Sequence, residues 1–175
     1  IPTMGPSARP MPYKDFPGTA REMNKDDIAN IRKWYRLAVK RAIQAGFDVV
    51  TIYVSHGITV FTDFLSPYLN KRNDEYGGNI MNRVRLLRET LEEVLEEAKG
   101  KCAVAIRYGV GDKDNSTGIS LEDSKSVIKS LSELPDFWDI NVGSVSDMLT
   151  SRFKKEGWQE ENISFIKNIT SKPVV

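Results

Sequence analysis

The chain contains very few of the side chains that most often bind metals. Among its 175 residues there is one cysteine, Cys102, and one histidine, His56. A single cysteine excludes an internal disulfide, and it excludes a zinc or iron–sulfur site built from several cysteines within this segment. We therefore expect no metal site in these residues, and a reducing, cytoplasmic setting.

The chain also lacks an excess of charge and a long apolar run. Its 25 Lys and Arg against 24 Asp and Glu leave a net charge of +1, which provides no basic field for nucleic acid. No apolar run approaches the roughly 20 residues that a membrane-spanning helix needs. No charged and then apolar segment typical of a signal peptide opens the sequence. We expect neither nucleic acid nor membrane as a partner.

Proline is concentrated in residues 1–23, which hold Pro2, Pro6, Pro10, Pro12 and Pro17. Proline breaks helices and cannot donate to a sheet ladder, so this density excludes a helix or a central strand. We predict an extended surface loop over this part of the chain.

From residue 24 onward, helical and strand patterns alternate. Asn24 and Ser120 are typical helix N-caps, and Asp123 adds a capping-box pattern to the second. The predicted helices cover residues 24–46, 80–99, 120–134 and a segment after 157; the predicted strands cover 47–54, 102–106, 137–142 and a start at 172–175. Such alternation predicts parallel βαβ units, and no dinucleotide-binding glycine motif follows any strand.

Polar side chains stand where two of these strands end. Tyr53 and His56 close the first strand, and Arg107 closes the second. Ligands gather at the carboxyl ends of parallel strands in α/β folds. A charge such as Arg107 needs an anionic partner there, which is either a nearby carboxylate or a bound ligand. For Tyr53 and His56, purely structural roles stay open.

The loop between residues 55 and 79 carries Lys71, Arg72 and Asp74, which we expect to pin it by charge and hydrogen bonds. Gly77 and Gly78 follow, and glycines permit backbone angles that other residues resist. A phosphate-binding role for this glycine pair is the weaker alternative.

A family resemblance becomes specific between Ala45 and Arg85, which include the block FLSPYLNKRNDEYGGNIMNRVR. This block resembles the central signature of the FMN-dependent (β/α)8-barrel oxidoreductases of the old yellow enzyme superfamily. The most similar branch is that of trimethylamine and dimethylamine dehydrogenases. Supporting stretches are REMNKDDI from residue 21, AIRYGV from 105 and WDINVG from 138.

The resemblance implies a TIM barrel of which residues 1–175 are the central half, about strands four to seven. Residues 1–23 would then help to cover the active site, and residues 24–175 would form the alternating units of a partial FMN-binding catalytic domain. The main loops for the FMN phosphate would lie outside this segment. A half-barrel exposes sheet edges, so we expect a homo-oligomer or a complementing barrel half as partner.

The resemblance also implies roles for single residues. Arg107 matches the arginine that lies against the N1 and C2-carbonyl side of the flavin ring of FMN. Tyr53 and His56 match the pair that faces the substrate over the flavin. Asp147, which precedes a Ser-Arg-Phe, is the candidate to complete this set. Ile58 stands where many reductases of the superfamily carry a proton-donating tyrosine. Trp138 and Asp139 are predicted to be structural and to face the helices.

These matches predict oxidative N-demethylation of a small methylated amine by hydride transfer to FMN, with the electron acceptor unknown. A [4Fe–4S] cluster, where the protein has one, would be bound outside this segment. An NAD(P)H-dependent enoate or 2,4-dienoyl reductase is the first alternative, although Tyr53 and Ile58 disfavour it. A half-barrel that is inactive as a fragment is the second.

Overall fold

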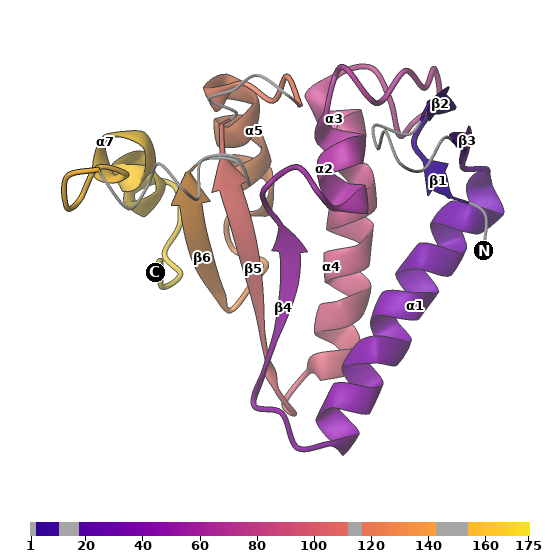
Figure 1. Cartoon of the computed structure of the whole chain (residues 1–175). Helices are drawn as coiled ribbons and strands as arrows, with labels where there is room; N and C mark the ends of the chain where they lie inside the picture. The colour runs from indigo at the N-terminus through magenta and orange to yellow at the C-terminus, as the bar shows by residue number, and fades with distance from the viewer. Residues whose placement is uncertain (1–2, 11–17, 112–116, 143–153) are drawn as a thin grey trace.

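A parallel three-stranded sheet organises the computed structural model, which describes residues 3–10, 18–111, 117–142 and 154–175. The strands β4 (Val49–Val54), β5 (Ala103–Val110) and β6 (Phe137–Val142) run in the same direction, in the order β4-β5-β6 (Figure 1). A parallel bridge between Trp138 and Val174 continues the sheet beyond β6. The prediction of parallel βαβ units is confirmed.

The two faces of this sheet differ in chemistry, because successive side chains of a strand point to opposite faces. One face is apolar and packs into the core; it carries Ile52, Val54, Ile106, Tyr108, Trp138 and Ile140. The opposite face carries polar side chains at the carboxyl ends of the strands; these are Tyr53, Arg107, Asp139 and Asn141. The apolar face therefore holds the fold together, and the polar face is available for chemistry.

Three amphipathic helices supply the apolar side of the core: α1 (Lys25–Gln44), α4 (Arg85–Ala98) and α5 (Leu121–Leu131). Asn24 caps α1 and Ser120 caps α5, and both make the reciprocal bonds of a capping box, as predicted. The one-turn helix α7 (Glu160–Ile163) continues directly into the 3-10 helix η2 (Ser164–Asn168). Among the described residues, no helix has both the length and the apolar character needed to span a bilayer.

Three boundaries differ from the sequence prediction. The loop after β4 contains a short helix, α2 (Val60–Leu65), which Thr59 caps. The predicted helix over residues 80–99 is divided into α3 (Ile80–Arg83) and α4. Strand β5 extends to Val110, so Arg107 lies within the strand and not at its end. The ladder with β6 continues through Gly109 and Val110, beyond the predicted end at residue 106.

The proline-rich start also differs from the predicted extended loop. It contains the short strands β1 (Met4–Gly5), β2 (Arg9–Pro10) and β3 (Thr19–Glu22), in the order β1-β3-β2. The central strand β3 has no proline, and Pro10 lies in an edge strand, where a missing N–H group costs no ladder bond. Residues 11–17 lie outside the described residues.

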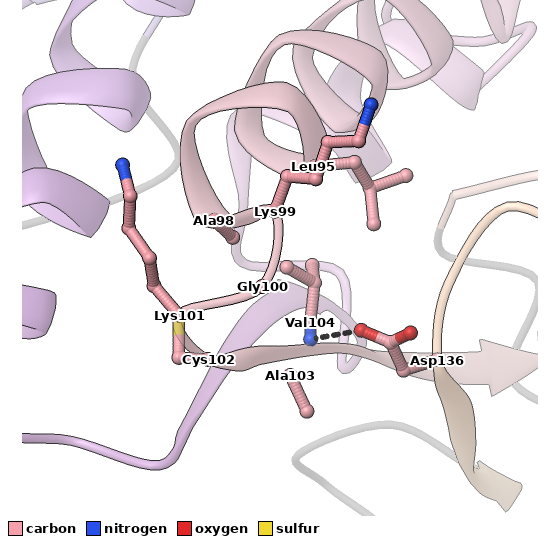
Figure 2. A pocket seen from close by; sticks show the side chains of 9 residues that line it. All are labelled: Leu95, Ala98, Lys99, Gly100, Lys101, Cys102, Ala103, Val104 and Asp136. Atoms are coloured by element: carbon pink, nitrogen blue, oxygen red, sulfur yellow. Dashed lines mark hydrogen bonds between the residues drawn. The ribbon is translucent and has the colours of Figure 1, made fainter.

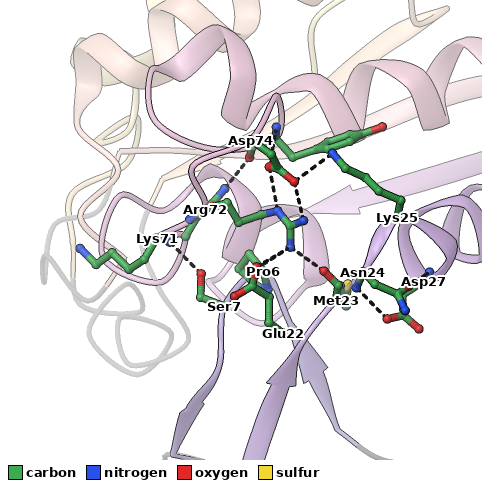
Figure 3. A network of polar contacts seen from close by, with 12 residues as sticks. Pro6, Ser7, Glu22, Met23, Asn24, Lys25, Asp27, Lys71, Arg72 and Asp74 are labelled. Atoms are coloured by element: carbon green, nitrogen blue, oxygen red, sulfur yellow. Dashed lines mark hydrogen bonds and ion pairs between the residues drawn. The ribbon is translucent and has the colours of Figure 1, made fainter.

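Arg72 fastens this small sheet to the loop before α3 (Figure 3). Its guanidinium donates to the carbonyl oxygens of Pro6 at 3.0 Å and Met23 at 2.6 Å. It also forms a fork with both carboxylate oxygens of Asp74, at 3.0 and 2.6 Å. The hydrogen bond from Arg72 lowers the pKa of Asp74 well below its ordinary range. The predicted structural role of Arg72 and Asp74 is confirmed.

Gly77 lies directly against the backbone of Arg72. A Cβ atom at this position would collide with the Arg72 carbonyl oxygen and Cβ. The need for close backbone approach accounts for a glycine here. The phosphate-binding alternative for Gly77 and Gly78 stays a hypothesis.

Candidate active site

A row of polar residues crosses the sheet near the carboxyl ends of its strands. The register places Tyr53 of β4 beside Arg107 of β5, and Arg107 beside Asp139 of β6. Arg107 Nη1 donates to Asp139 Oδ2 at 2.7 Å, and the two side chains are 38% and 31% exposed. The anionic partner predicted for Arg107 is thus Asp139 within the described residues.

Asp139 itself corrects a prediction, because it does not face the helices. Trp138 takes the helix-facing position with 0% exposure, and its Nε1 donates to the Ser132 carbonyl at 3.1 Å. Strand alternation then turns Asp139 to the opposite face. Of the two residues, only Trp138 faces the helices as predicted.

His56 lies just beyond β4 and turns back toward Tyr53. Its backbone has φ of 61°, the left-handed region that few residues other than glycine adopt. Nδ1 of His56 is hydrogen-bonded to the Tyr53 hydroxyl. Strained backbone of this kind is concentrated at functional sites, where the surrounding structure holds it. The structure therefore brings together the two residues that the sequence singled out.

Two influences lower the pKa of His56: burial of the ring first, and then the positive charge of Arg107. Both disfavour the imidazolium ion. His56 is consequently neutral at neutral pH and offers one donor and one acceptor nitrogen.

Asn141 of β6 is the member of this site that sequence reasoning missed. Its Nδ2 lies 3.2 Å from His56 Nε2, and its Oδ1 accepts a hydrogen bond from Ser55 Oγ at 2.8 Å. Asn141 follows Asp139 by two residues and so shares its face of the sheet. This two-residue spacing is the feature of the sequence that could have identified Asn141 as a site residue.

Two further predicted features have different outcomes. Asp147 lies outside the described residues. Ile58 is described and is 66% exposed.

The described residues contain no cluster of three or more His, Cys, Asp or Glu that could hold a metal ion. The iron–sulfur cluster and the cytoplasmic setting stay predictions.

A cavity in the described part of the chain lies away from this row. It has a volume of about 370 Å³ and adjoins the start of β5, where Lys99, Lys101 and Cys102 line it (Figure 2). The Asp136 carboxylate accepts a hydrogen bond from the Val104 N–H group at 2.7 Å and is thereby used structurally. Residues at the amino ends of barrel strands serve stability, while active sites form at the carboxyl ends. The polar row remains the candidate active site.

The donor set of this row fits a flavin. Within the described part of the chain, Arg107 uses one nitrogen on Asp139, so its other N–H groups can donate to acceptor atoms of a bound ring. A cation beside a flavin stabilises the reduced, anionic form. Arg107 would hold the N1 and C2-carbonyl side of the flavin ring, and Tyr53 and His56 would lie on the side of the ring where the substrate binds.

Comparisons with curated proteins give relatives of two kinds. The chain is 32% identical to an NADPH dehydrogenase of Clostridium acetobutylicum over 172 residues, which are 98% of this chain and 49% of that protein. It is also 32% identical to the dimethylamine dehydrogenase of Hyphomicrobium sp. over 181 residues, which are 98% of this chain and 24% of that protein. The chain thus spans half or less of these relatives.

Solved structures agree closely with the fold. The 6-hydroxypseudooxynicotine amine oxidase of Pseudomonas geniculata N1 superposes with a TM-score of 0.93 at 44% identity, over 99% of this chain and 26% of that one. The histamine dehydrogenase of Rhizobium sp. 4-9 gives a TM-score of 0.90 at 38% identity, over 98% of this chain and 25% of that one.

The family model for NADH:flavin oxidoreductases and NADH oxidases matches residues 4–175. An old yellow enzyme homologue of Zymomonas mobilis, which is a (β/α)8 barrel, superposes with a TM-score of 0.77 at 26% identity, over 99% of this chain and 50% of that one. The chain therefore belongs to the NADH:flavin oxidoreductase / NADH oxidase family, whose cofactor is FMN, and it forms a central part of the family's (β/α)8 barrel.

Proposed function

We propose that the protein oxidises a carbon–nitrogen bond of a small methylated amine. The observation that carries this proposal is the hydrogen-bonded Tyr53–His56 pair, in which Tyr53 lies beside Arg107 near the carboxyl ends of the strands. When bound, FMN supplies the acceptor for the hydride that leaves the methyl carbon of the amine. The oxidised amine then hydrolyses to formaldehyde and the smaller amine.

The residues of the chain divide the remaining work. An amine releases hydride only when its nitrogen is neutral, so the site must favour the unprotonated form. Tyr53 would hydrogen-bond the substrate nitrogen, and a neutral His56 would add no positive charge beside it. Arg107 would hold the flavin and stabilise negative charge on its ring. Asp147 is proposed to complete the Tyr53–His56 set.

The amine-oxidising relatives support this assignment. The amine oxidase at 44% identity and the histamine dehydrogenase at 38% identity each superpose over nearly the whole chain. Their names do not fix the amine that this protein uses. The choice of a methylated amine is supported by the resemblance of the Tyr53–His56 pattern to the trimethylamine and dimethylamine dehydrogenases.

An NAD(P)H-dependent enoate reductase is the second candidate, because the NADPH dehydrogenase of Clostridium acetobutylicum is as similar as the dimethylamine dehydrogenase. Enone reduction needs a proton donor for the substrate carbon. Ile58 has none to give, and it occupies the position where many reductases carry a tyrosine. This difference favours amine oxidation.

Anaerobic reduction of the FMN-loaded full protein tests the proposal. Trimethylamine, dimethylamine and an N-methylated amino acid are added separately, and flavin bleaching and formaldehyde release are followed. We expect at least one amine to bleach the flavin with formaldehyde as product. Bleaching by NADPH alone, followed by turnover with an enone, would instead establish the reductase.

Tyr53→Phe provides the matched variant, because it removes one hydroxyl and keeps the ring. We expect flavin reduction by the amine to slow by about 100-fold, the lower end of the effect of a positioned proton-transfer group. The flavin absorbance of the variant should match that of the wild-type protein. An unchanged rate would remove Tyr53 from the reaction.

A further inference from the structure

Ser55, which directly follows β4, and Asn141 of β6 are joined by a hydrogen bond although β4 and β6 are not neighbours. Strand β5 lies between β4 and β6, yet Ser55 Oγ reaches Asn141 Oδ1 at 2.8 Å. The β5 residue beneath this contact is Gly109, which the register pairs with Asn141. A Cβ at Gly109 would lie 2.8 Å from Ser55 Oγ, closer than a carbon and an oxygen can pack. Gly109 therefore leaves the gap through which the contact passes.

The Asn141 amide has its oxygen on Ser55 and its NH2 group on His56. An amide oxygen only accepts hydrogen bonds and an amide NH2 only donates them. In this orientation Asn141 Oδ1 accepts from Ser55 Oγ at 2.8 Å, and the NH2 of Asn141 is directed to His56 Nε2, at 3.2 Å. Nε2 must then be the acceptor nitrogen, so a neutral imidazole carries its hydrogen on Nδ1.

The tautomer of His56 in turn decides what Tyr53 presents to the substrate. A hydrogen on Nδ1 is donated to the Tyr53 oxygen, with which Nδ1 is in contact. The hydroxyl hydrogen of Tyr53 is then directed away from His56. In the opposite tautomer Tyr53 would give its hydrogen to Nδ1 and could only accept.

We propose that Ser55, Gly109 and Asn141 are positioning residues that fix His56 as the Nδ1–H tautomer, so that Tyr53 acts as a hydrogen-bond donor to the substrate. A donor at this place binds a neutral amine through the nitrogen lone pair, whereas an ammonium ion has no lone pair to offer. The selection of the neutral amine rests on the proposed function. The tautomer does not, because it follows from contacts within the chain.

Solid-state NMR of the FMN-loaded full protein, labelled with 15N-histidine, tests the tautomer directly. A His56→Gln difference spectrum assigns the imidazole signals. We expect a protonated Nδ1 and an unprotonated Nε2. A hydrogen on Nε2, or on both nitrogens, would overturn the proposal.

Asn141→Asp sharpens the test, because it replaces the donating NH2 with an oxygen that only accepts. We expect either of two results: the imidazole hydrogen moves from Nδ1 to Nε2, or Nε2 is protonated in addition to Nδ1, which gives the imidazolium ion. Asn82→Asp is the matched control, since it makes the same change beside Arg85, away from the site. The control should leave the His56 signals in place. Unchanged signals in Asn141→Asp would contradict the proposal.

A double-mutant cycle tests the gap at Gly109. Gly109→Ala and Ser55→Ala should each yield a mixture of the two tautomers, because either change releases the Asn141 amide. In the Ser55→Ala protein, adding Gly109→Ala should shift the mixture no further. Additive shifts would mean that the two residues act separately. Flavin absorbance confirms that each variant is folded.

The tautomer measurement and the amine-reduction measurement can fail independently. A protein that reduces enones but shows Nδ1–H would refute the proposed function and leave the tautomer assignment standing. A protein that oxidises amines but shows Nε2–H would refute only the positioning role of Ser55, Gly109 and Asn141.

Discussion

Arg72 and Arg107 are both arginines paired with an aspartate, yet they occupy opposite kinds of environment. The Arg72 side chain is 5% exposed, and its guanidinium is used on two backbone carbonyls and both oxygens of Asp74. The Arg107 side chain is 38% exposed and makes one hydrogen bond, to Asp139, within the described residues. A guanidinium whose three nitrogens all have partners within the protein stabilises the fold, whereas one with a nitrogen to spare can bind a ligand.

The comparison predicts that substitutions at Arg72 and at Arg107 affect different properties of the protein. Changes around Arg72 should lower the free energy of unfolding and leave the strand-end site intact. Changes around Arg107 should affect FMN binding more than stability, because a half-exposed ion pair contributes only about 0–1 kcal/mol.

The largest expected effect is that of Arg72→Met. Removal of this guanidinium leaves the Pro6 and Met23 carbonyls without their donor, while Asp74 keeps Lys25 and the Tyr76 N–H group. Each buried acceptor that is left unsatisfied costs about 1–3 kcal/mol. Urea unfolding of the variant measures this loss. Arg36→Met is the control, because the Arg36 side chain is 48% exposed and its contact to Glu93 is 3.7 Å long. Equal stability of the two variants would refute the structural role of Arg72.

Gly77→Ala should have the next largest effect. The added methyl group must displace the Arg72 backbone, and overpacking of this kind costs about 1–3 kcal/mol. Gly5→Ala is the control, because its added Cβ would meet only the Ser7 carbonyl at an ordinary 3.5 Å. Thermal unfolding of both variants decides the matter. A Gly77→Ala protein as stable as Gly5→Ala would show that the close approach is not required.

A smaller effect is expected in acid. The Arg72 hydrogen bond holds the pKa of Asp74 below its ordinary value of 3.8. A lowered pKa gives stability that is present above pH 3.8 and is lost as the pH falls through the lowered value. Asp74→Asn should therefore be less stable than wild type at pH 6, and the difference should shrink in acid.

Unfolding measured between pH 2 and pH 6 tests this trend. Glu96→Gln on the exposed side of α4 controls for the loss of one surface carboxylate. A constant difference between Asp74→Asn and wild type across this range would exclude the Asp74 linkage.

Local sequence signals predicted most of the fold. The caps Asn24 and Ser120 and the apolar strand runs act within a few residues, so a single segment reveals them. The direction of Asp139 depends instead on which residue of β6 packs against the helices, and the large Trp138 takes that place. Helix α2 is short and depends on its Thr59 cap, so periodicity did not reveal it.

The site was predicted in part for the same reason. Tyr53, His56 and Arg107 stand near strand ends in the sequence, whereas the contacts of Asn141 span 85 residues to His56 and 86 to Ser55. The Ser55–Asn141 hydrogen bond over Gly109 depends on strand order and register, which a single sequence does not give. Likewise, the carbonyl partners of Arg72 come from residues 66 and 49 positions away.

The most direct test of the contrast between the two arginines is the FMN dissociation constant of Arg107→Met, measured by fluorescence titration of the full protein against wild type. The account predicts binding weaker by about tenfold, equivalent to about 1.4 kcal/mol, with the free energy of unfolding of the FMN-free protein changed by no more than about 1 kcal/mol. An unchanged dissociation constant would contradict it and would make the Arg107–Asp139 pair a structural salt bridge.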